Sequence, residues 1–301
     1  MSAITQKPAT DGQKKQLNRF LADVVEKVAI EQLVETLGLS SPETQRVIEH
    51  GDELAEDVRT TVIASIKRLS VSDNFKNEEV ASNYGYLSGY KPKGITPQTN
   101  RLRELFPGIG FANEKLAESP LTPNAEGWFA IPGWDKIAPT YGEAVQKVFD
   151  LLKQTRNGRF TNYREGQLGP NQLRLSTKTA SAFEKLGEAQ KDYDILVVPA
   201  QFGLRHRGRS VRRARETFLG NEFGLGAFAI GIMLLTHPER LQDYNDLWID
   251  CAGDEFSPDA DGSFSGCPFF YFLDSRLRFA AGGVSVALGD FGSASAFLPQ
   301  I

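Results

Sequence analysis

The chain has 301 residues, of which 41% are hydrophobic and 24% are charged. These fractions are close to the averages for soluble globular proteins, which excludes a largely disordered chain, a collagen-like repeat or a coiled-coil rod as the dominant architecture. The formal net charge is −4. The field of the whole molecule therefore does not attract polyanions, and any nucleic-acid contact must rest on a local basic patch.

The two cysteines, Cys251 and Cys267, are too few for a fold that depends on disulfides. We expect either one bridge or two buried thiols. Residues 1–8 have no apolar stretch after a basic start, and the longest apolar run, 223–235, is shorter than the roughly 20 residues that cross a bilayer. The sequence therefore predicts a cytoplasmic protein without membrane contact, in which residues 223–235 form a buried element.

The first part of the chain is predicted to be helical. Residues 1–15 are polar and without periodicity, so we expect a mobile arm there. Residues 16–83 are predicted to form a helical hairpin, because apolar residues recur at helical spacing from Leu17 to Gly38 and again towards Leu69, with an interruption at Gly51. Ser41 is the expected N-cap of the second stretch. The apolar faces of this hairpin are a candidate surface for self-association.

Residues 37–48 also resemble the turn and second helix of a helix-turn-helix DNA reader. Acidic side chains surround Arg46 in this segment, and they would repel the phosphates of a duplex. Two packed helices are therefore the favoured interpretation.

Seven of the 15 prolines lie between positions 92 and 139. We expect residues 84–139 to form an irregular connector that wraps over a surface and buries Trp128, Phe129 and Trp134. The alternative is that the tryptophans line a ligand site.

Residues 140–301 are predicted to form an α+β domain, and the whole chain an α+β fold with an amino-terminal helical hairpin, a Pro/aromatic-rich wrapping segment and a small mixed or antiparallel carboxy-terminal sheet with packed helices. Helices are expected at 141–153 and around 182–186, and a buried strand at 193–199. No element is assigned to 156–176. Further short strands are expected at 247–251, 269–273, 277–281, 284–288 and 293–298.

Residues 201–215 contain six arginines, one histidine and no acid. We expect Ser210 to cap a helix that turns Val211, Ala214 and Phe218 inward. A strand, a glycine-containing loop and a helix amino terminus gather backbone N–H donors, and arginines add charge. The segment therefore predicts a site for nucleic-acid backbone or a phosphorylated ligand, formed by Arg205, His206, Arg207, Arg209, Ser210, Arg212 and Arg213.

An alternative is internal charge pairing. Residues 241–275 contain eight acids and no Lys or Arg, so this segment is a candidate partner for the arginines. Under this alternative the protein has a structural or assembly role, and the arginines fix how its layers dock.

A second alternative is an enzyme that uses the acidic end of the strand at 247–251. Asp250, Asp254 and Glu255 are candidate catalytic residues, and Asp250 and Asp254 are candidate ligands for Mg²⁺, because clustered carboxylates bind hard cations and exchange protons. This predicts a metal-assisted hydrolase or a phosphoryl-processing enzyme. The nearby Asp259 and Asp261 do not complete a calcium loop, because Pro268 occupies the last ligand position.

The sequence also contains two weaker motifs. Residues 224–229 match a loose dinucleotide fingerprint, but the sequence indicates no strand before them, and no P-loop occurs, so no nucleotide cofactor is expected. Cys251 with His206 or His237 as base is a candidate nucleophile, for which a buried structural thiol is the favoured interpretation.

Overall fold

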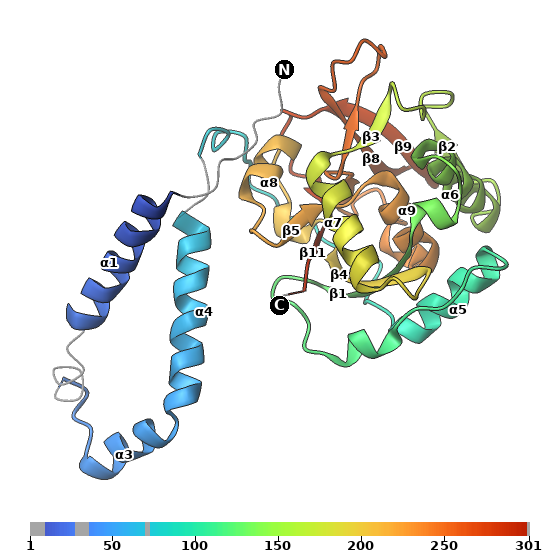
Figure 1. Ribbon diagram of the computed structural model, residues 1–301. Helices are drawn as coiled ribbons and strands as arrows, with labels where there is room; N and C mark the ends of the chain where they lie inside the picture. The colour runs from blue at the N-terminus through green and yellow to red at the C-terminus, as the bar shows by residue number, and fades with distance from the viewer. Residues whose placement is uncertain (1–9, 28–35, 70–72, 300–301) are drawn as a thin grey trace. The chain divides into compact units, whose positions relative to one another are not determined.

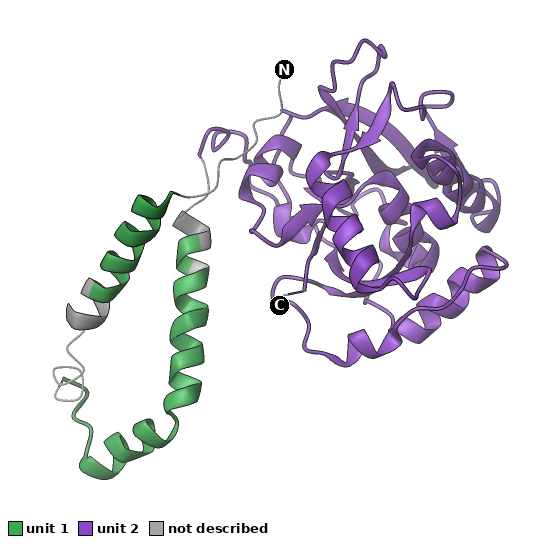
Figure 2. Ribbon diagram, viewed as in Figure 1, with its two compact units in different colours: residues 1–69 green, residues 70–301 purple. Residues whose placement is uncertain are grey.

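The computed structural model describes residues 10–27, 36–69 and 73–299, and the chain divides into two compact units, residues 1–69 and 70–301 (Figure 2). The sequence placed boundaries near 83 and 139 instead. Residues 73–83 contact the second unit through the Val80 N–H, which donates to the Gly208 carbonyl, and residues beyond 84 contribute buried side chains such as Tyr90 and Ile95 to its core.

The first unit contains helices α1 (Asp11–Lys27), α3 (Ser41–Glu49) and α4 (Gly51–Leu69). Helix α1 begins inside the expected arm because Thr10 and Gln13 cap it reciprocally, with N–H to side-chain oxygen distances of 2.8 and 3.3 Å. Ser40, one residue before the expected Ser41, is the N-cap of α3. An interruption is present, but it lies at His50, and the expected position Gly51 is the first residue of α4. The part of the expected first helix at 28–35 lies outside the described residues.

No side chain described in the first unit is buried. Phe20 is 59% exposed and Ile48 is 65% exposed, although both belong to amphipathic helices. Each of these helices therefore presents its apolar face to solvent within the described residues.

The second unit contains a four-stranded antiparallel sheet in the order β1-β4-β11-β5. Its strand β4 is buried along its whole length, which confirms the strand expected at 193–199. Strand β1 lies in the proline-rich segment where little regular structure was expected. The proline does not prevent this strand from forming, because β1 lies at the edge of the sheet and Pro132 is its last residue. The missing N–H of the proline therefore removes no hydrogen bond between strands. The strands are β1 (Gly127–Pro132), β4 (Ile195–Gln201), β5 (Glu222–Gly224) and β11 (Ser295–Phe297).

A second, mixed sheet runs in the order β10-β6-β8-β7-β3, and β9 pairs with both β8 and β2. The strand expected at 284–288 is wrong, because these residues follow β9 as turn and irregular chain. The strand expected at 293–298 is divided at Ala294, so that consecutive strands β10 and β11 belong to different sheets and join them. The strands are β2 (Phe160–Asn162), β3 (Leu173–Leu175), β6 (Trp248–Asp250), β7 (Asp254–Phe256), β8 (Gly266–Leu273), β9 (Arg276–Gly283) and β10 (Phe291–Ser293).

Helix α9 is central to the second unit, and all of its residues are buried (Figure 1). It packs against α6, α5 and β1, which confirms that the apolar run at 223–235 is a buried element. Gly231 permits the close approach of α6, since a Cβ there would lie 2.5 Å from Val148. The helices are α5 (Ile95–Leu105), α6 (Tyr141–Thr155), α7 (Thr177–Ala189), α8 (Val211–Thr217) and α9 (Ala227–Thr236), with short 3₁₀ helices η1 (Glu114–Glu118), η2 (Trp134–Lys136), η3 (Leu204–His206) and η4 (Pro238–Arg240).

The α+β class is confirmed, with helices first and two sheets toward the carboxy-terminal half. Among the described residues, no helix combines the length and apolar character that a bilayer crossing requires.

Candidate functional site

We call residues 201–215 the arginine segment. It begins at Gln201, the last residue of the buried strand β4. As expected, Ser210 caps α8: its Oγ accepts the Arg213 N–H at 3.1 Å. Val211, Ala214 and Phe218 are buried, so the inward face of this helix is also as predicted. Arg213 departs from the prediction, since it is only 7% exposed rather than directed at solvent with its neighbours.

Carboxylates bind most of the guanidinium groups in this segment. Arg205 Nε lies 3.2 Å from both carboxylate oxygens of Glu222. Arg212 forms a bidentate contact with Glu78. Arg209 pairs with Glu79 at 3.4 Å, while Arg213 contacts Glu79, Asp73 at 3.5 Å and Glu216 at 2.7 Å.

These partners differ from the ones considered in the sequence. The acids of 241–275 do not pair with Arg205, Arg209, Arg212 or Arg213 within the described residues; the partners come instead from 73–79, 216 and 222. Asp246, for example, accepts backbone N–H groups of Leu87, Gln242 and Asp243. The reason is topological, because the chain before Tyr84 runs beside α8, as the backbone bond from the Ser210 N–H to the Glu78 carbonyl indicates.

His206 and Ser210 also have internal partners. The His206 Nδ1 accepts a hydrogen bond from Arg209 at 3.2 Å, so Nε2 carries the proton and donates to Glu222 at 2.7 Å. Burial lowers the pKa of His206, which favours this neutral form. Ser210 Oγ donates to Glu78 at 2.6 Å.

Two arginines of the segment have no carboxylate partner in the described part of the chain: Arg215, which is half-buried and donates to the backbone carbonyls of Ala252 and Asp254, and Arg207. Arg207 is exposed, and its guanidinium donates to the Tyr84 carbonyl at 2.9 Å. The segment thus offers an incoming anion one exposed guanidinium, and its role as an anion site stays a prediction.

The candidate acids at 250–255 have three separate environments. Glu255 pairs with Arg174 at 2.8 Å, and Asp254 is buried against α9 and α6. Asp250 is 6% exposed, and burial raises its pKa to about 7. Across the described ranges, no group of three or more His, Cys, Asp or Glu side chains is arranged to hold a metal ion.

The weaker motifs have structural explanations. Strand β5 does precede the glycines at 224 and 226, contrary to the sequence interpretation, but the Asp254 carboxylate accepts the Ala227 N–H and occupies the amino terminus of α9 where a phosphate would lie. Gly224 instead lets the backbone at Ala252 approach closely. Cys251 and Cys267 are buried free thiols, and burial raises the pKa of Cys251, which disfavours a nucleophilic thiolate.

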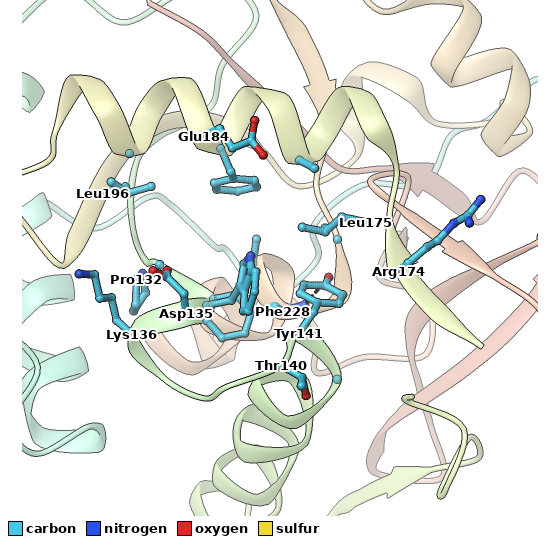
Figure 3. A pocket seen from close by; sticks show the side chains of 18 of the residues that line it. Pro132, Asp135, Lys136, Thr140, Tyr141, Arg174, Leu175, Glu184, Leu196 and Phe228 are labelled. Atoms are coloured by element: carbon cyan, nitrogen blue, oxygen red, sulfur yellow. Dashed lines mark hydrogen bonds between the residues drawn. The ribbon is translucent and has the colours of Figure 1, made fainter. Parts of the chain in front are cut away.

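A pocket of about 710 Å³ opens between the amino termini of α6 and α9, helix α7 and the turn after β1 (Figure 3). Its wall is largely apolar and aromatic. The aromatic lining comes from Trp134, Tyr141, Phe183, Tyr193 and Phe228. Of the six charged residues that line the pocket, Asp194 is half-buried and pairs with Lys136 at 3.5 Å. The other five are exposed, namely Asp135, Lys136, Arg174, Glu184 and Lys191.

Tyr141 lines the pocket and is hydrogen-bonded to Asp254, which is fully buried and is not itself a lining residue. The Tyr141 hydroxyl donates to Asp254 Oδ1 at 2.7 Å, and Oδ2 accepts the Ala227 N–H at 2.7 Å. Burial is the main cause that raises the pKa of Asp254 to about 7, because these two neutral donors compensate the charge only in part. Near neutral pH the carboxyl therefore populates both protonation states, and its proton can be exchanged with the hydroxyl of a residue that lines the pocket.

Gly226 makes this pair possible. A Cβ at this position would lie 2.3 Å from Asp254 Oδ1 and 2.5 Å from the Tyr141 hydroxyl. Only a residue without a side chain leaves room for both groups.

The sequence identified Asp254 as a candidate but not its partners. Tyr141 lies 113 positions earlier in the chain, and its place at the start of a helix gave no chemical signal. Trp134 lines the pocket whereas Trp128 does not, and the alternative that the tryptophans line a ligand site stays a prediction. Phe183 and Phe228 resembled ordinary core residues, and no local pattern distinguishes a pocket wall from a core.

Comparison of the chain with protein-family models gives no match, and comparisons with curated proteins and with solved structures give none either. The function is therefore argued from geometry alone.

Proposed function

We propose that this protein binds a small, largely apolar organic molecule in the pocket between α6, α7 and α9. The volume of about 710 Å³ carries the proposal. It lies inside the range of roughly 300–1,000 Å³ that is typical of ligand sites, and such sites combine apolar walls with a few placed polar groups.

The aromatic side chains favour a ligand with flat rings. Ring systems gain both apolar burial and edge-to-face contacts against aromatic walls. Trp134 and Tyr141 already pack edge to face, with ring centroids 6.2 Å apart, which fixes the orientation of one wall. The Tyr141–Asp254 pair supplies the point where a polar atom of the ligand would be held.

The pair also makes proton transfer the chemistry best supported for this site. A carboxyl with a pKa of about 7 gives up or accepts a proton near neutral pH with little cost, as general acids and bases require. Asp254 would act through the Tyr141 hydroxyl. Of the candidate catalytic residues in the enzyme alternative, this proposal keeps Asp254, and it does not involve a metal ion.

Binding of an anionic partner by the arginine segment is less well supported than the pocket. Most of its guanidinium groups already have carboxylate partners, and a ligand would have to replace them. Arg207 is the residue on which that hypothesis now depends.

The proposal is tested by filling the pocket. Gly187 lines it from α7, and a Cβ there meets nothing within 4 Å, so Gly187→Leu extends into open space without a clash. We expect wild type to enhance the fluorescence of 1-anilinonaphthalene-8-sulfonate, and Gly187→Leu to weaken this binding at least about tenfold, or about 1.4 kcal/mol.

Ala189→Leu is the matched control, because it adds a side chain of similar size to an exposed position of the same helix. Binding of the dye to the exposed faces of the first unit is common to all three proteins and cancels in the comparison. Equal binding by both variants, with folding intact, would refute a ligand site in this pocket.

A further inference from the structure

The mixed sheet has one face in the protein core. Ile249, Phe270 and Phe279 are fully buried on it. Phe149 of α6 packs on this face, with ring centroids 6.0 Å from Phe270 and 4.5 Å from Phe279. Because side chains alternate along a strand, the residues between these lie on the opposite face.

The strand register places an aromatic series on that opposite face. Phe291 pairs with Trp248, and the pairing of Ile249 with Phe270 sets Trp248 opposite Tyr271. Tyr271 in turn pairs with Arg278. The centroid distances from Trp248 to Phe291 and to Tyr271 are 5.0 and 4.9 Å, so the rings are in contact. We call this series the aromatic row; it consists of the rings of Phe291, Trp248 and Tyr271 and ends at Arg278.

Further rings extend the aromatic row. Phe269 lies 5.1 Å from Phe291, and Tyr244 lies 6.1 Å from Trp248. At the other end, Arg278 donates to the Tyr163 hydroxyl at 3.1 Å. Strand β2 adds a fifth strand to this face, since its Thr161 pairs with Arg278. The four spacings between five strands, at about 4.8 Å each, give a width of roughly 19 Å.

This face is open to solvent. Tyr244 is 54% exposed and Tyr163 is 53% exposed, and the rings of Phe291, Trp248 and Tyr271 are half-buried. A sheet with one core face usually carries polar side chains on its other face. A solvent-facing face made of aromatic rings departs from that pattern and is typical of a binding surface.

Charge distinguishes among the partners that such rings fit. Arg159 and Arg276 are exposed beside the row, and neither has a carboxylate partner among the described residues. Arg276 donates to the Gly158 carbonyl at 3.1 Å, which holds the two arginines at the same edge. Asp290 adjoins Phe291 at the β10 end of the row. At the β2 and β9 end the acid Asp274 is paired with Arg278, so Arg159 and Arg276 make that end cationic.

We propose that the aromatic row binds single-stranded nucleic acid, with bases stacked on Trp248 and Tyr271 and phosphates near Arg159 and Arg276. Stacking on aromatic side chains combined with backbone contacts to cations is the usual mode for single strands. A duplex does not fit, because its base faces are covered by their neighbours. The local patch that the net charge of −4 requires is thus supplied by the sheet and lies outside the arginine segment.

The test is a titration of the full chain into fluorescein-labelled oligouridine and oligothymidine dodecamers, followed by anisotropy. We expect binding that weakens as salt is raised. Trp248→Ala should weaken it by about tenfold, since one base stack contributes roughly 5- to 150-fold in affinity. Phe111→Ala is the matched control: Phe111 is 65% exposed and also has an arginine, Arg103, 4.5 Å over its ring, but lies elsewhere.

A second measurement guards against misfolding of the Trp248 variant. Photo-crosslinking of wild type with 4-thiouridine RNA should label Tyr271, Trp248 or Phe291 in mass spectrometry. The proposal is overturned by the absence of an anisotropy change up to about 100 µM protein, by crosslinks confined to other segments, or by equal losses in the Trp248 and Phe111 variants. Binding of a neutral oligosaccharide such as cellohexaose in place of the oligonucleotides would equally overturn it and assign the row to glycans.

Discussion

Two buried carboxyl groups in the second unit have pKa values that are shifted in opposite directions. Glu222 and Asp254 are both fully inaccessible to solvent. The pKa of Glu222 is lowered to about 2, because Arg205, His206 and Ser295 together outweigh its burial. The pKa of Asp254 is raised to about 7, because a tyrosine hydroxyl and a backbone N–H do not outweigh the same penalty. The nature of the donors, and not the depth of burial, decides the charge.

The difference separates a structural site from a candidate functional one. In the arginine segment, opposite charges neutralise one another, and the segment fixes the position of α8. Beside the pocket, the Asp254 carboxyl has neutral hydrogen-bond donors, and the nearby Arg215 offsets its burial only in part. Perturbed pKa values beside a cavity are typical of functional sites. The density of arginines in the sequence therefore drew attention to the arginine segment, whose charged groups are less accessible to a ligand than the pocket is.

The largest effect is expected from Glu222→Gln. It leaves Arg205 next to a neutral side chain in a buried site, and removing one partner of a buried ion pair costs about 3–5 kcal/mol. Urea unfolding measures this loss. Arg207→Ala, in the exposed arginine of the same segment, should change the free energy of unfolding by no more than about 0.5 kcal/mol. Similar losses in both variants would contradict the internal role of the segment.

The pH dependence of stability should differ between the two carboxyls. Glu222 contributes about 3 kcal/mol above pH 4.5, its ordinary pKa, and this contribution is lost as the pH falls through about 2. The contribution of Asp254 to stability changes with pH in the opposite direction. Since its folded pKa is raised from 3.8 to about 7, the full stability is present below pH 3.8, and up to about 4 kcal/mol is lost as the pH rises from 3.8 to about 7.

Asp254→Asn tests the second half of this prediction. An amide can donate to the Tyr141 oxygen and accept from the Ala227 N–H, so it imitates the protonated acid. We expect the variant to match wild type below about pH 3.8, and to exceed it in free energy of unfolding by a margin that grows up to about pH 7 and is constant above it. Parallel stability curves from pH 5 to 8 would show that Asp254 does not titrate there.

The smallest of these effects is expected from Gly226→Ala. The added methyl overlaps Asp254 and Tyr141, which must move apart, and overpacking of this kind costs about 1–3 kcal/mol. The same substitution at Gly187, where nothing lies within 4 Å, should be neutral or stabilise by up to about 1 kcal/mol. Thermal unfolding of the two variants compares them directly, and an intact Tyr141–Asp254 pair in a crystal structure of Gly226→Ala would contradict the steric argument.

The sequence by itself determined the elements whose signals are local. Helix α6, strand β4 and the Ser210 cap of α8 were predicted because periodicity, apolar content and capping depend on residues a few positions apart. The α+β class followed from the order of these elements. Errors occurred where local signals competed, as at residues 284–288, whose apolar content suggested a strand although no neighbouring strand pairs with them.

Only the tertiary structure decided which charges are used and which are free. Arg212 meets Glu78 across 134 positions, and Tyr141 meets Asp254 across 113. Contacts of this separation depend on how two sheets and α9 pack, because the affinity of a guanidinium for a carboxylate is the same whichever acid the fold brings to it. The alternation that places Trp248 and Tyr271 on one face of the mixed sheet was present in the sequence. That this face is the solvent-exposed one depends on the tertiary structure, because α6 packs on the opposite face.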